Sequence, residues 1–348
     1  MKAITKVRSD ALSIKRSERL ISGGKKHHES YKPLLAIASV FLATVLSVPF
    51  PVWGQTTGTL TIVADTILTE DHHGNIVIGA NGVELDCDGF DVVGSGSGLG
   101  ILLNNKTNVI VKRCNVSNFF DGFRLQNSDA NTLEANTAEN NSRFGFFLLF
   151  DSDANTLQQN TGRNNGLDGF GLDRNCSDNF LEGNTARDNA RAGYTVNFSS
   201  SNNTLVENNA ENNLGGGFSV ASFSENNILR QNTARNNGGN GFGLGVPPRL
   251  PANNNILDGN TAKNNDGHGF LISISSGNTF INNRAKNNAA DGFFLRNSGG
   301  NTLEANKARL NGAFGYRDEF TANTYLDNEC KDNLSGGSDP TGLCSPQP

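Results

Sequence analysis

One stretch of eight residues, Asn131-Thr132-Leu133-Glu134-Ala135-Asn136-Thr137-Ala138, decides the fold because the chain repeats it. Related copies begin at Asn155, Asn179, Asn203, Asn227, Asn255, Asn278, Asn301 and Asn323. The offsets between successive copies are 24, 24, 24, 24, 28, 23, 23 and 22 residues. A fixed period in this range indicates a repeat architecture, in which each unit buries its apolar face against its neighbours.

Each repeat carries a second fixed element, a glycine followed by an aromatic residue and, two positions later, an apolar residue. In Gly122-Phe123-Arg124-Leu125 the apolar residues lie at i and i+2, the period of a strand with one buried face. The same element begins at Gly145, Gly169, Gly193, Gly217, Gly241, Gly269 and Gly292. Turns rich in Asn, Asp, Ser and Gly separate these strands from the eight-residue stretch.

After residue 55 the sequence shows no sustained helical periodicity, and Asn and Gly are poor helix formers. Short strands that recur in register without helices can bury one face by winding into a parallel β-helix. We therefore predict an all-β, right-handed parallel β-helix of about ten coils, each of 22–28 residues. Like residues then stack from coil to coil at about 4.8 Å.

This stacking predicts asparagine ladders along the axis, because each stacked amide can both donate and accept a hydrogen bond. A second series, five residues further on, runs from Asn141 to Asn311. We interpret both series as structural, with ligand binding as the alternative. The first series consists of Asn136, Asn160, Asn184, Asn208, Asn232, Asn260, Asn283, Asn306 and Asn328.

The chain divides into four parts. Residues 1–54 contain a basic region and the uncharged run Leu34–Val48, which together are typical of a secretory signal; an uncleaved membrane anchor is the alternative. Residues 55–107 are predicted to form an N-terminal cap and the first coils, residues 108–335 the regular coils, and residues 336–348 a C-terminal cap or tail. Either interpretation of the N-terminus predicts a secreted, periplasmic or cell-surface protein.

The net negative charge of the chain disfavours some classes of binding partner. The whole chain has 29 basic and 34 acidic residues, and without residues 1–54 it keeps 20 and 31, a net charge of −11. This balance argues against nucleic acid as a partner, because binding nucleic acid requires Lys and Arg to neutralise phosphates. Any membrane contact is expected only through an uncleaved N-terminal segment. We expect a monomer, because the proline-containing tail disfavours stacking of the coil ends.

The N-terminal coils carry a family resemblance. The sequence LDCDGFDVVGSG begins at Leu85, and NVIVKRCNVSNFFDGFRL begins at Asn108, with Arg113 where later coils place the ladder asparagine. With the repeats that follow, these stretches resemble the NosD-like periplasmic family over roughly residues 60–335. The resemblance implies a right-handed parallel β-helix and an accessory role in maturing a metal cofactor. The same fold also carries pectate lyases, polysaccharide hydrolases and alginate epimerases.

The residues do not favour a metal site. NosD-like proteins are associated with copper delivery, yet Met1 is the only methionine and, beyond residue 54, only His72, His73 and His268 remain as histidines. Copper sites use Cys, Met and His, so copper is disfavoured. No cofactor is expected, and calcium is expected only if the protein is a lyase.

Candidate catalytic residues lie at the position just before the repeated glycine. His268 and Asp291 occupy it on successive coils, and Asp266 and Arg296 lie nearby in the sequence. Such a set could abstract a proton from a uronic acid. Two further acids at this position, two coils apart, form a weaker hydrolase candidate: Asp121 and Asp168. Ordinary turn chemistry explains both sets without catalysis.

A binding role is suggested by apolar residues expected to face outward, which could stack on sugar rings: Phe147, Leu149, Leu271 and Phe294. Packing beneath turns is the alternative. The coils are too uniform for a dedicated cleft. The sequence therefore favours a non-catalytic module for carbohydrate or a cell-surface partner over a polysaccharide lyase, epimerase or hydrolase, and over an accessory protein of NosD type.

The cysteines predict one disulfide. Cys330 and Cys344 are expected to close the C-terminal end of an exported chain. Cys87 and Cys114 lie on neighbouring coils, but the register does not show that they face each other, so a bridge there is less expected. Cys176 is expected to be a free thiol in an exposed turn.

Overall fold

The computed structural model describes residues 50–51, 57–246, 250–320 and 322–346, all within one compact unit, Val48–Pro348. The predicted signal or anchor segment lies outside the described residues, apart from strand β1 (Phe50–Pro51). Every regular element in the described part is a β-strand, which confirms the predicted all-β parallel β-helix. Across those residues no helix could span a membrane.

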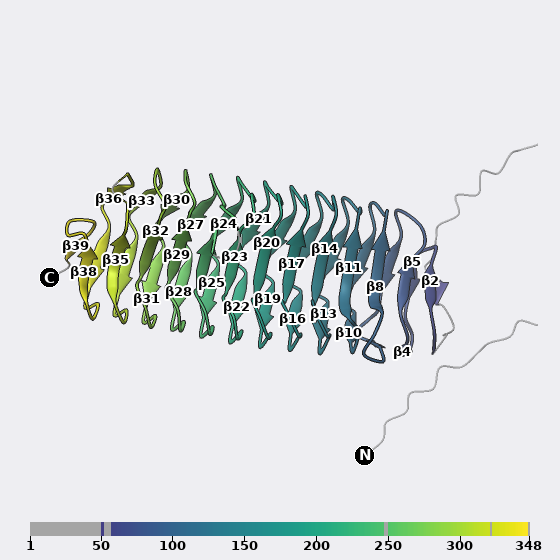
Figure 1. Cartoon of the computed structure of the whole chain (residues 1–348). Coiled ribbons are helices and arrows are strands. Elements are labelled where there is room, and N and C mark those ends of the chain that lie inside the picture. The colour runs from purple at the N-terminus through teal and green to yellow at the C-terminus, as the bar shows by residue number, and fades with distance from the viewer. Residues whose placement is uncertain (1–49, 52–56, 247–249, 321, 347–348) are drawn as a thin grey trace, which may run out of the picture. The chain divides into compact units, whose positions relative to one another are not determined.

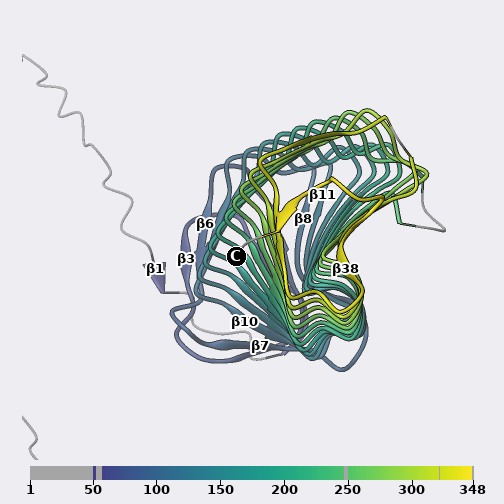
Figure 2. The same cartoon turned by 90° about the vertical axis from the view of Figure 1, so that its left-hand side faces the viewer.

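The strands form three parallel sheets of 13 strands each, and successive coils lie side by side (Figures 1 and 2). Irregular coils at the N-terminal end and further strands at the C-terminal end extend the regular repeats. Sheet A contains β1, β3 (Thr66–Ile67), β6 (Glu84–Asp86), β9 (Ile110–Lys112), β12 (Thr132–Glu134), β15 (Thr156–Gln158), β18 (Phe180–Glu182), β21 (Thr204–Val206), β24 (Ile228–Arg230), β27 (Ile256–Asp258), β30 (Thr279–Ile281), β33 (Thr302–Glu304) and β36 (Thr324–Leu326).

Sheet B receives the second strand of each coil. It contains β4 (His72–His73), β7 (Asp91–Val93), β10 (Asn115–Ser117), β13 (Thr137–Glu139), β16 (Thr161–Arg163), β19 (Thr185–Arg187), β22 (Asn209–Glu211), β25 (Thr233–Arg235), β28 (Thr261–Lys263), β31 (Arg284–Lys286), β34 (Lys307–Arg309), β37 (Glu329–Lys331) and β39 (Ser345–Pro346).

Sheet C is built from the glycine-aromatic element. It contains β2 (Leu60–Ile62), β5 (Ile76–Ile78), β8 (Leu99–Asn104), β11 (Asp121–Gln126), β14 (Phe146–Leu149), β17 (Phe170–Asp173), β20 (Tyr194–Asn197), β23 (Phe218–Val220), β26 (Phe242–Leu244), β29 (Phe270–Ser273), β32 (Phe293–Arg296), β35 (Phe314–Asp318) and β38 (Gly336–Asp339).

The core lies inside the coils. In one coil, Leu133 of sheet A, Ala138 of sheet B, and Phe146 and Leu148 of sheet C are all fully buried. The aromatic residue of sheet C stacks on its equivalents, with ring centroids 4.6–4.9 Å apart over nine coils. This spacing equals the strand separation, so the rings stack without disturbing the backbone register.

Each coil turns its three corners in the same way. A residue with positive φ comes first and a buried asparagine follows it, as in Ala130-Asn131, Ala135-Asn136 and Asn140-Asn141. The side-chain oxygen of each asparagine accepts bonds from the backbone N–H and the side-chain amide of its equivalent one coil earlier, at 2.8–3.1 Å along the Asn136 series. The two predicted ladders are present, and the Asn131 series forms a third that the sequence analysis did not identify.

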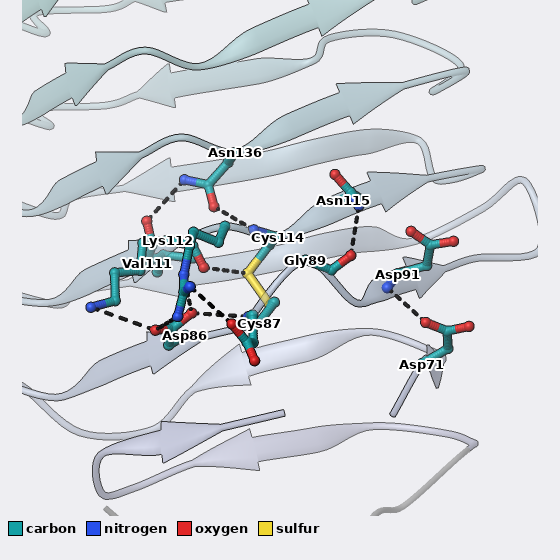
Figure 3. Close-up of a disulfide and its surroundings, with 12 residues drawn as sticks. Asp71, Asp86, Cys87, Gly89, Asp91, Val111, Lys112, Cys114, Asn115 and Asn136 are labelled. Carbon is teal, nitrogen blue, oxygen red and sulfur yellow. Dashed lines mark hydrogen bonds and ion pairs between the residues drawn. A yellow bond between two sulfur atoms is a disulfide. The ribbon is translucent and has the colours of Figure 1, made fainter. Parts of the chain in front are cut away.

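The N-terminal end of the Asn136 ladder is closed by a disulfide, which corrects the weaker expectation for Cys87 and Cys114 (Figure 3). The backbone N–H of Cys114 donates to the Asn136 Oδ1 at 2.9 Å, so Cys114 occupies the ladder position that we had assigned to Arg113. Arg113 instead forms an ion pair with Asp86, and Lys112 lies 3.5 Å from the same carboxylate.

The other cysteines lie at specialised positions. The predicted Cys330–Cys344 disulfide is present, and Cys330 pairs with Ala308 in register, so it takes the place of the small inward residue of sheet B. Cys176 is free as predicted, but it is fully buried rather than exposed. It lies in a column of serines: its N–H donates to the Ser200 Oγ as Ser128 N–H does to Ser152 Oγ.

Candidate functional site

The outer face of sheet C carries a column of residues, one per coil, that we call the central row. The register of the strands aligns these residues from β11 to β35. Large side chains occupy both ends of the central row and small ones occupy its middle. Its members are Arg124, Phe147, Gly171, Thr195, Ser219, Gly243, Leu271, Phe294 and Arg317.

At the N-terminal end, aromatic rings and guanidinium groups pack together. Phe144 and Phe147 stack with centroids 4.1 Å apart, and the Arg143 guanidinium lies 5.0 Å and 5.3 Å from these two rings. A Cβ atom at Gly171 would lie 2.9 Å from the Phe144 ring, so only glycine leaves room for the stacked pair. Arg124 lies 5.5 Å from the Phe147 centroid.

Asp121 lies beneath this cluster and is fully buried. Its carboxylate accepts two bonds from Arg143, at 3.0 and 3.1 Å, and forms an ion pair of 2.7 Å with Arg124. Burial lowers the pKa of the Arg124 guanidinium, whose Nε is buried and has no hydrogen-bond partner among the described residues.

Asp168 repeats this arrangement two coils further on. It is fully buried, and it accepts bonds from Arg191 Nε at 2.8 Å, Ala192 N–H at 2.9 Å and Thr195 Oγ1 at 3.0 Å. The hydrogen bond to Asp168 raises the pKa of Arg191, which remains cationic. Both predicted hydrolase acids are thus engaged by arginine and by backbone or hydroxyl donors.

These side chains surround an open hollow of about 410 Å³. A neighbouring hollow of about 210 Å³, which also has Arg191 in its wall, continues over the small residues of the central row toward Val246. The larger hollow is lined by Arg124, Arg143, Phe144, Phe147, Leu149, Leu167, Asp173, Arg174, Arg191, Asn197 and Phe198.

The residues expected to face outward do lie on the outer side of sheet C, but they are not exposed. Phe147, Leu271 and Phe294 are 4%, 7% and 7% exposed, because neighbouring side chains cover them. Phe147 belongs with Phe144 and Leu149 to a small apolar cluster separate from the core. The prediction of open aromatic platforms is therefore wrong for these positions, and the exposed ring beside the hollow is Phe198, at 55%.

The predicted lyase set is only partly brought together. His268 Nδ1 lies 3.3 Å from the Asp291 carboxylate, and the same nitrogen accepts the Asp291 N–H at 3.2 Å. Asp291 also accepts the Phe314 N–H at 2.8 Å. Arg296 donates to the Ser273 Oγ at 3.4 Å, and Asp266 is exposed on a turn. The structure therefore brings His268 and Asp291 together, but not all four residues of the predicted set.

The region near the N-terminal end contains fewer side chains that could bind a ligand or take part in a reaction. A hollow of about 510 Å³ near the N-terminal end is lined mainly by Gly and Ser, with His73 at its edge. His72 is buried and contacts the Gly58 carbonyl oxygen at 3.2 Å. Within the described residues there is no group of three or more His, Cys, Asp or Glu that could hold a metal ion.

The arginines of the sheet C hollow were missed by the sequence analysis. A signal for two of them exists, because Arg143 and Arg191 share one position in the repeat. Each comes one coil after an aspartate at the neighbouring position, Asp121 or Asp168. The regular repeat therefore predicts the two ion pairs once its register is known.

Comparisons with known proteins support the architecture. The sequence matches the family described as "right handed beta helix region" over residues 99–245 and 250–341. No curated protein matches the sequence.

Several solved structures are similar. The A-module of the Azotobacter vinelandii mannuronan C-5 epimerase AlgE6 has a TM-score of 0.62 and 13% identity, covering 82% of this chain and 91% of that one. The catalytic domain of a GH87 α-1,3-glucanase, in complex with tetrasaccharides, has a TM-score of 0.63 and 12% identity, covering 87% and 70%. A mutant of the periplasmic alginate epimerase AlgG has a TM-score of 0.51 and 14% identity, covering 80% and 78%. At these identities the likeness shows a shared fold.

Proposed function

Because this chain belongs to the right-handed β-helix family, we propose that it is an exported protein that binds a carbohydrate chain on the outer face of sheet C without cleaving it. The two disulfides are consistent with an oxidising compartment, the periplasm or the cell surface. Fold alone does not assign the ligand, so the proposal depends on the residues of the sheet C hollow.

The observation that carries the proposal is the composition of this hollow. It combines an exposed ring, Phe198, with the guanidinium groups of four arginines that line its wall. Aromatic faces stack on sugar rings, and fixed N–H donors bind hydroxyl oxygens; binding sites of this kind place a few polar groups on an apolar lining. The adjoining hollow extends the surface along the axis, as a linear chain requires.

The charge of the hollow favours sugar hydroxyls over a strongly anionic ligand. Arg124 and Arg143 share Asp121, and Arg191 pairs with Asp168. The wall also contains Asp173, so three acids offset most of the charge of the four arginines. The same ion pairs argue against hydrolysis, since an acid held by arginine and backbone donors is poorly placed to exchange a proton with substrate. The similar structures named above act on alginate or α-1,3-glucan, which supports carbohydrate as the ligand class.

Binding can be tested with α-1,3-glucan oligosaccharides and the purified protein in isothermal titration calorimetry. Replacing Phe198, which is more than half exposed, should leave the fold intact. We expect Phe198→Ala to weaken binding about tenfold, which corresponds to about 1.4 kcal/mol. Phe223→Ala is the matched control, because Phe223 is 50% exposed, lies one coil further on and does not line the hollow. Equal affinities for wild type and Phe198→Ala would reject this site.

A polysaccharide-modifying enzyme remains the second candidate, favoured by the His268–Asp291 contact. His268 is partly exposed and Asp291 is buried beneath it, an arrangement in which the carboxylate can orient the imidazole for proton transfer. Turnover that is lost in His268→Ala would support this alternative.

A further inference from the structure

We infer that a second face, on sheet B, binds a linear acidic polysaccharide along the axis of the coils. The inference does not depend on the site on sheet C. It rests on a block of basic side chains at the C-terminal half of sheet B, which we call the basic column. Its members are Lys263, Arg284, Lys286, Lys307, Arg309 and Lys331.

The strand register places these cations directly beside one another. Lys263 pairs with Lys286, Lys286 with Arg309, and Arg309 with Lys331. Arg284 pairs with Lys307 in the parallel row two residues earlier. Neighbouring members are therefore separated by about 4.8 Å along the axis and about 6.6 Å along the strand.

Few acids offset this charge. Within β28, β31, β34 and β37, Glu329 is the acidic residue in these rows, and it pairs with Lys307 at 3.0 Å and with Arg309 at 3.3 Å. The hydrogen bond from Lys307 lowers the pKa of Glu329. Among the described residues, Lys263, Arg284 and Lys286 form no ion pair, and all three are exposed.

The N-terminal half of the same sheet shows what a purely structural surface looks like. There each outward arginine forms an ion pair: Arg163 with Glu139, Arg187 with Asp188, and Arg235 with Glu211. Like charges at about 5 Å repel, so a column of cations without acidic partners lowers stability, whereas ion-paired cations do not. A local rule broken without structural benefit is a mark of a functional surface.

The shape of the column indicates the ligand. Four of the cations, Arg284, Lys286, Lys307 and Arg309, line a hollow of about 350 Å³, and Lys263 and Lys331 extend it at either end. The column is two side chains wide and spans about 14 Å from β28 to β37. A linear polyuronate suits this shape, because it presents a carboxylate on each sugar and its rise per sugar is close to the coil spacing. Guanidinium and ammonium groups both bind carboxylates.

Flat and duplex anions fit less well. The net charge of −11 beyond residue 54 repels an extended anionic membrane or a nucleic acid over most of the surface. A single polysaccharide strand needs contact only with the narrow column.

The test compares two double variants with the same number of neutralised charges, using an oligogalacturonate in titration calorimetry at low and physiological salt. We expect Arg284→Gln/Lys286→Gln to weaken binding at least tenfold and to reduce its salt dependence. The control Arg163→Gln/Arg187→Gln, in the half of sheet B where the arginines form ion pairs, should bind like wild type. Thermal unfolding checks the fold, and removing like charges should leave the melting temperature of the first variant equal or higher.

Several results would overturn the inference: no binding of oligogalacturonate by wild type, equal loss in both double variants, or equally tight binding of phosphatidylglycerol vesicles or single-stranded DNA. The two faces can be separated in the same experiment. Arg284→Gln/Lys286→Gln should keep α-1,3-glucan binding, and Phe198→Ala should keep oligogalacturonate binding, so that failure of one site leaves the other testable.

Discussion

Single asparagines connect neighbouring coils of this molecule. The amide of Asn184 donates to the Leu157 carbonyl oxygen at 2.8 Å and to the Asn208 Oδ1 at 3.0 Å, while its own Oδ1 accepts from Asn160. The side chain is fully buried. Its polar groups form all their hydrogen bonds only when three successive coils are in register. Each ladder residue therefore stabilises both the alignment of the coils and the turn at its corner.

Replacing Asn184 by alanine should be costly. It leaves the buried Asn160 N–H and Leu157 carbonyl without these partners, and each such group costs about 1–3 kcal/mol. We expect Asn184→Ala to lower the free energy of unfolding by about 3 kcal/mol in urea denaturation. Gln158→Ala, at a partly exposed outward position of the adjacent coil, should cost less than about 1 kcal/mol. Similar losses in both variants would contradict a structural role for the ladder.

Cys176 should make the free energy of unfolding decrease at alkaline pH. Burial raises the pKa of its thiol from 9.0 to about 12. As pH rises, the thiol therefore loses its proton in the unfolded chain before it does so in the folded protein. Its contribution to the free energy of unfolding is complete below about pH 9 and is lost as pH rises toward 12, at up to about 1.4 kcal/mol per pH unit. Cys176→Ser should fold normally, because serine occupies this position in neighbouring coils, and its stability should fall less steeply with pH. Identical pH profiles would show that the thiol ionises without unfolding.

At the residue scale, the sequence predicted the residues that recur in every repeat but not the side chains that cover them. The ladder residues follow from periodicity, because one register determines all of them. The one-residue error that placed Arg113 in the ladder arose in an irregular coil, where Cys114 replaces the asparagine. The burial of Phe147 depends on Phe144, Leu149 and their neighbours, and no periodic pattern reports such contacts.

At the scale of elements, sheets B and C approach each other closely at the repeated glycine. A Cβ atom at Gly169 would lie 2.6 Å from the Ala186 Cβ and 3.0 Å from the Gly193 oxygen. The glycine therefore allows the strand after it to follow the turn while its carbonyl and N–H stay in the ladder of sheet C.

Gly169→Ala should destabilise the protein by about 1–3 kcal/mol, because the added methyl group overpacks this corner. Gly299→Ala is the matched control: its Cβ would meet only the Ala322 Cβ at 3.4 Å and the Phe320 ring at 3.9 Å, which are ordinary contacts. Chemical denaturation of both variants measures the difference. No difference between them would contradict the close approach of the sheets.

At the scale of elements, the strands of each coil were predictable and the hollow on sheet C was not. Alternating apolar residues define strands such as β14 from sequence alone. The hollow requires Arg143 and Arg191 to reach back one coil to Asp121 and Asp168, and this contact becomes visible only after the coils are placed in register.

The whole solenoid must protect its two ends, since a stack of parallel strands is stabilised mainly by nearest neighbours. Both disulfides lie toward these ends: Cys87–Cys114 where the Asn136 ladder begins, and Cys330–Cys344 near its last member, Asn328. Removing a native disulfide typically costs about 2–5 kcal/mol.

The N-terminal disulfide should therefore limit fraying of the first coils. We expect Cys87→Ser/Cys114→Ser to accelerate hydrogen–deuterium exchange in β6, β7 and β9, while β20 and β23 in the middle of the stack exchange as in wild type. Uniform acceleration throughout the stack would instead indicate that the solenoid opens as one cooperative unit.

The central functional claim is that this solenoid holds carbohydrate without altering it. The most direct test is mass spectrometry of α-1,3-glucan and alginate oligosaccharides after prolonged incubation with the purified protein, together with the nuclear magnetic resonance spectrum of the uronate anomers. The account predicts bound but unchanged oligosaccharides. Shortened, unsaturated or epimerised products that disappear in His268→Ala or Asp291→Ala would contradict it and identify an enzyme.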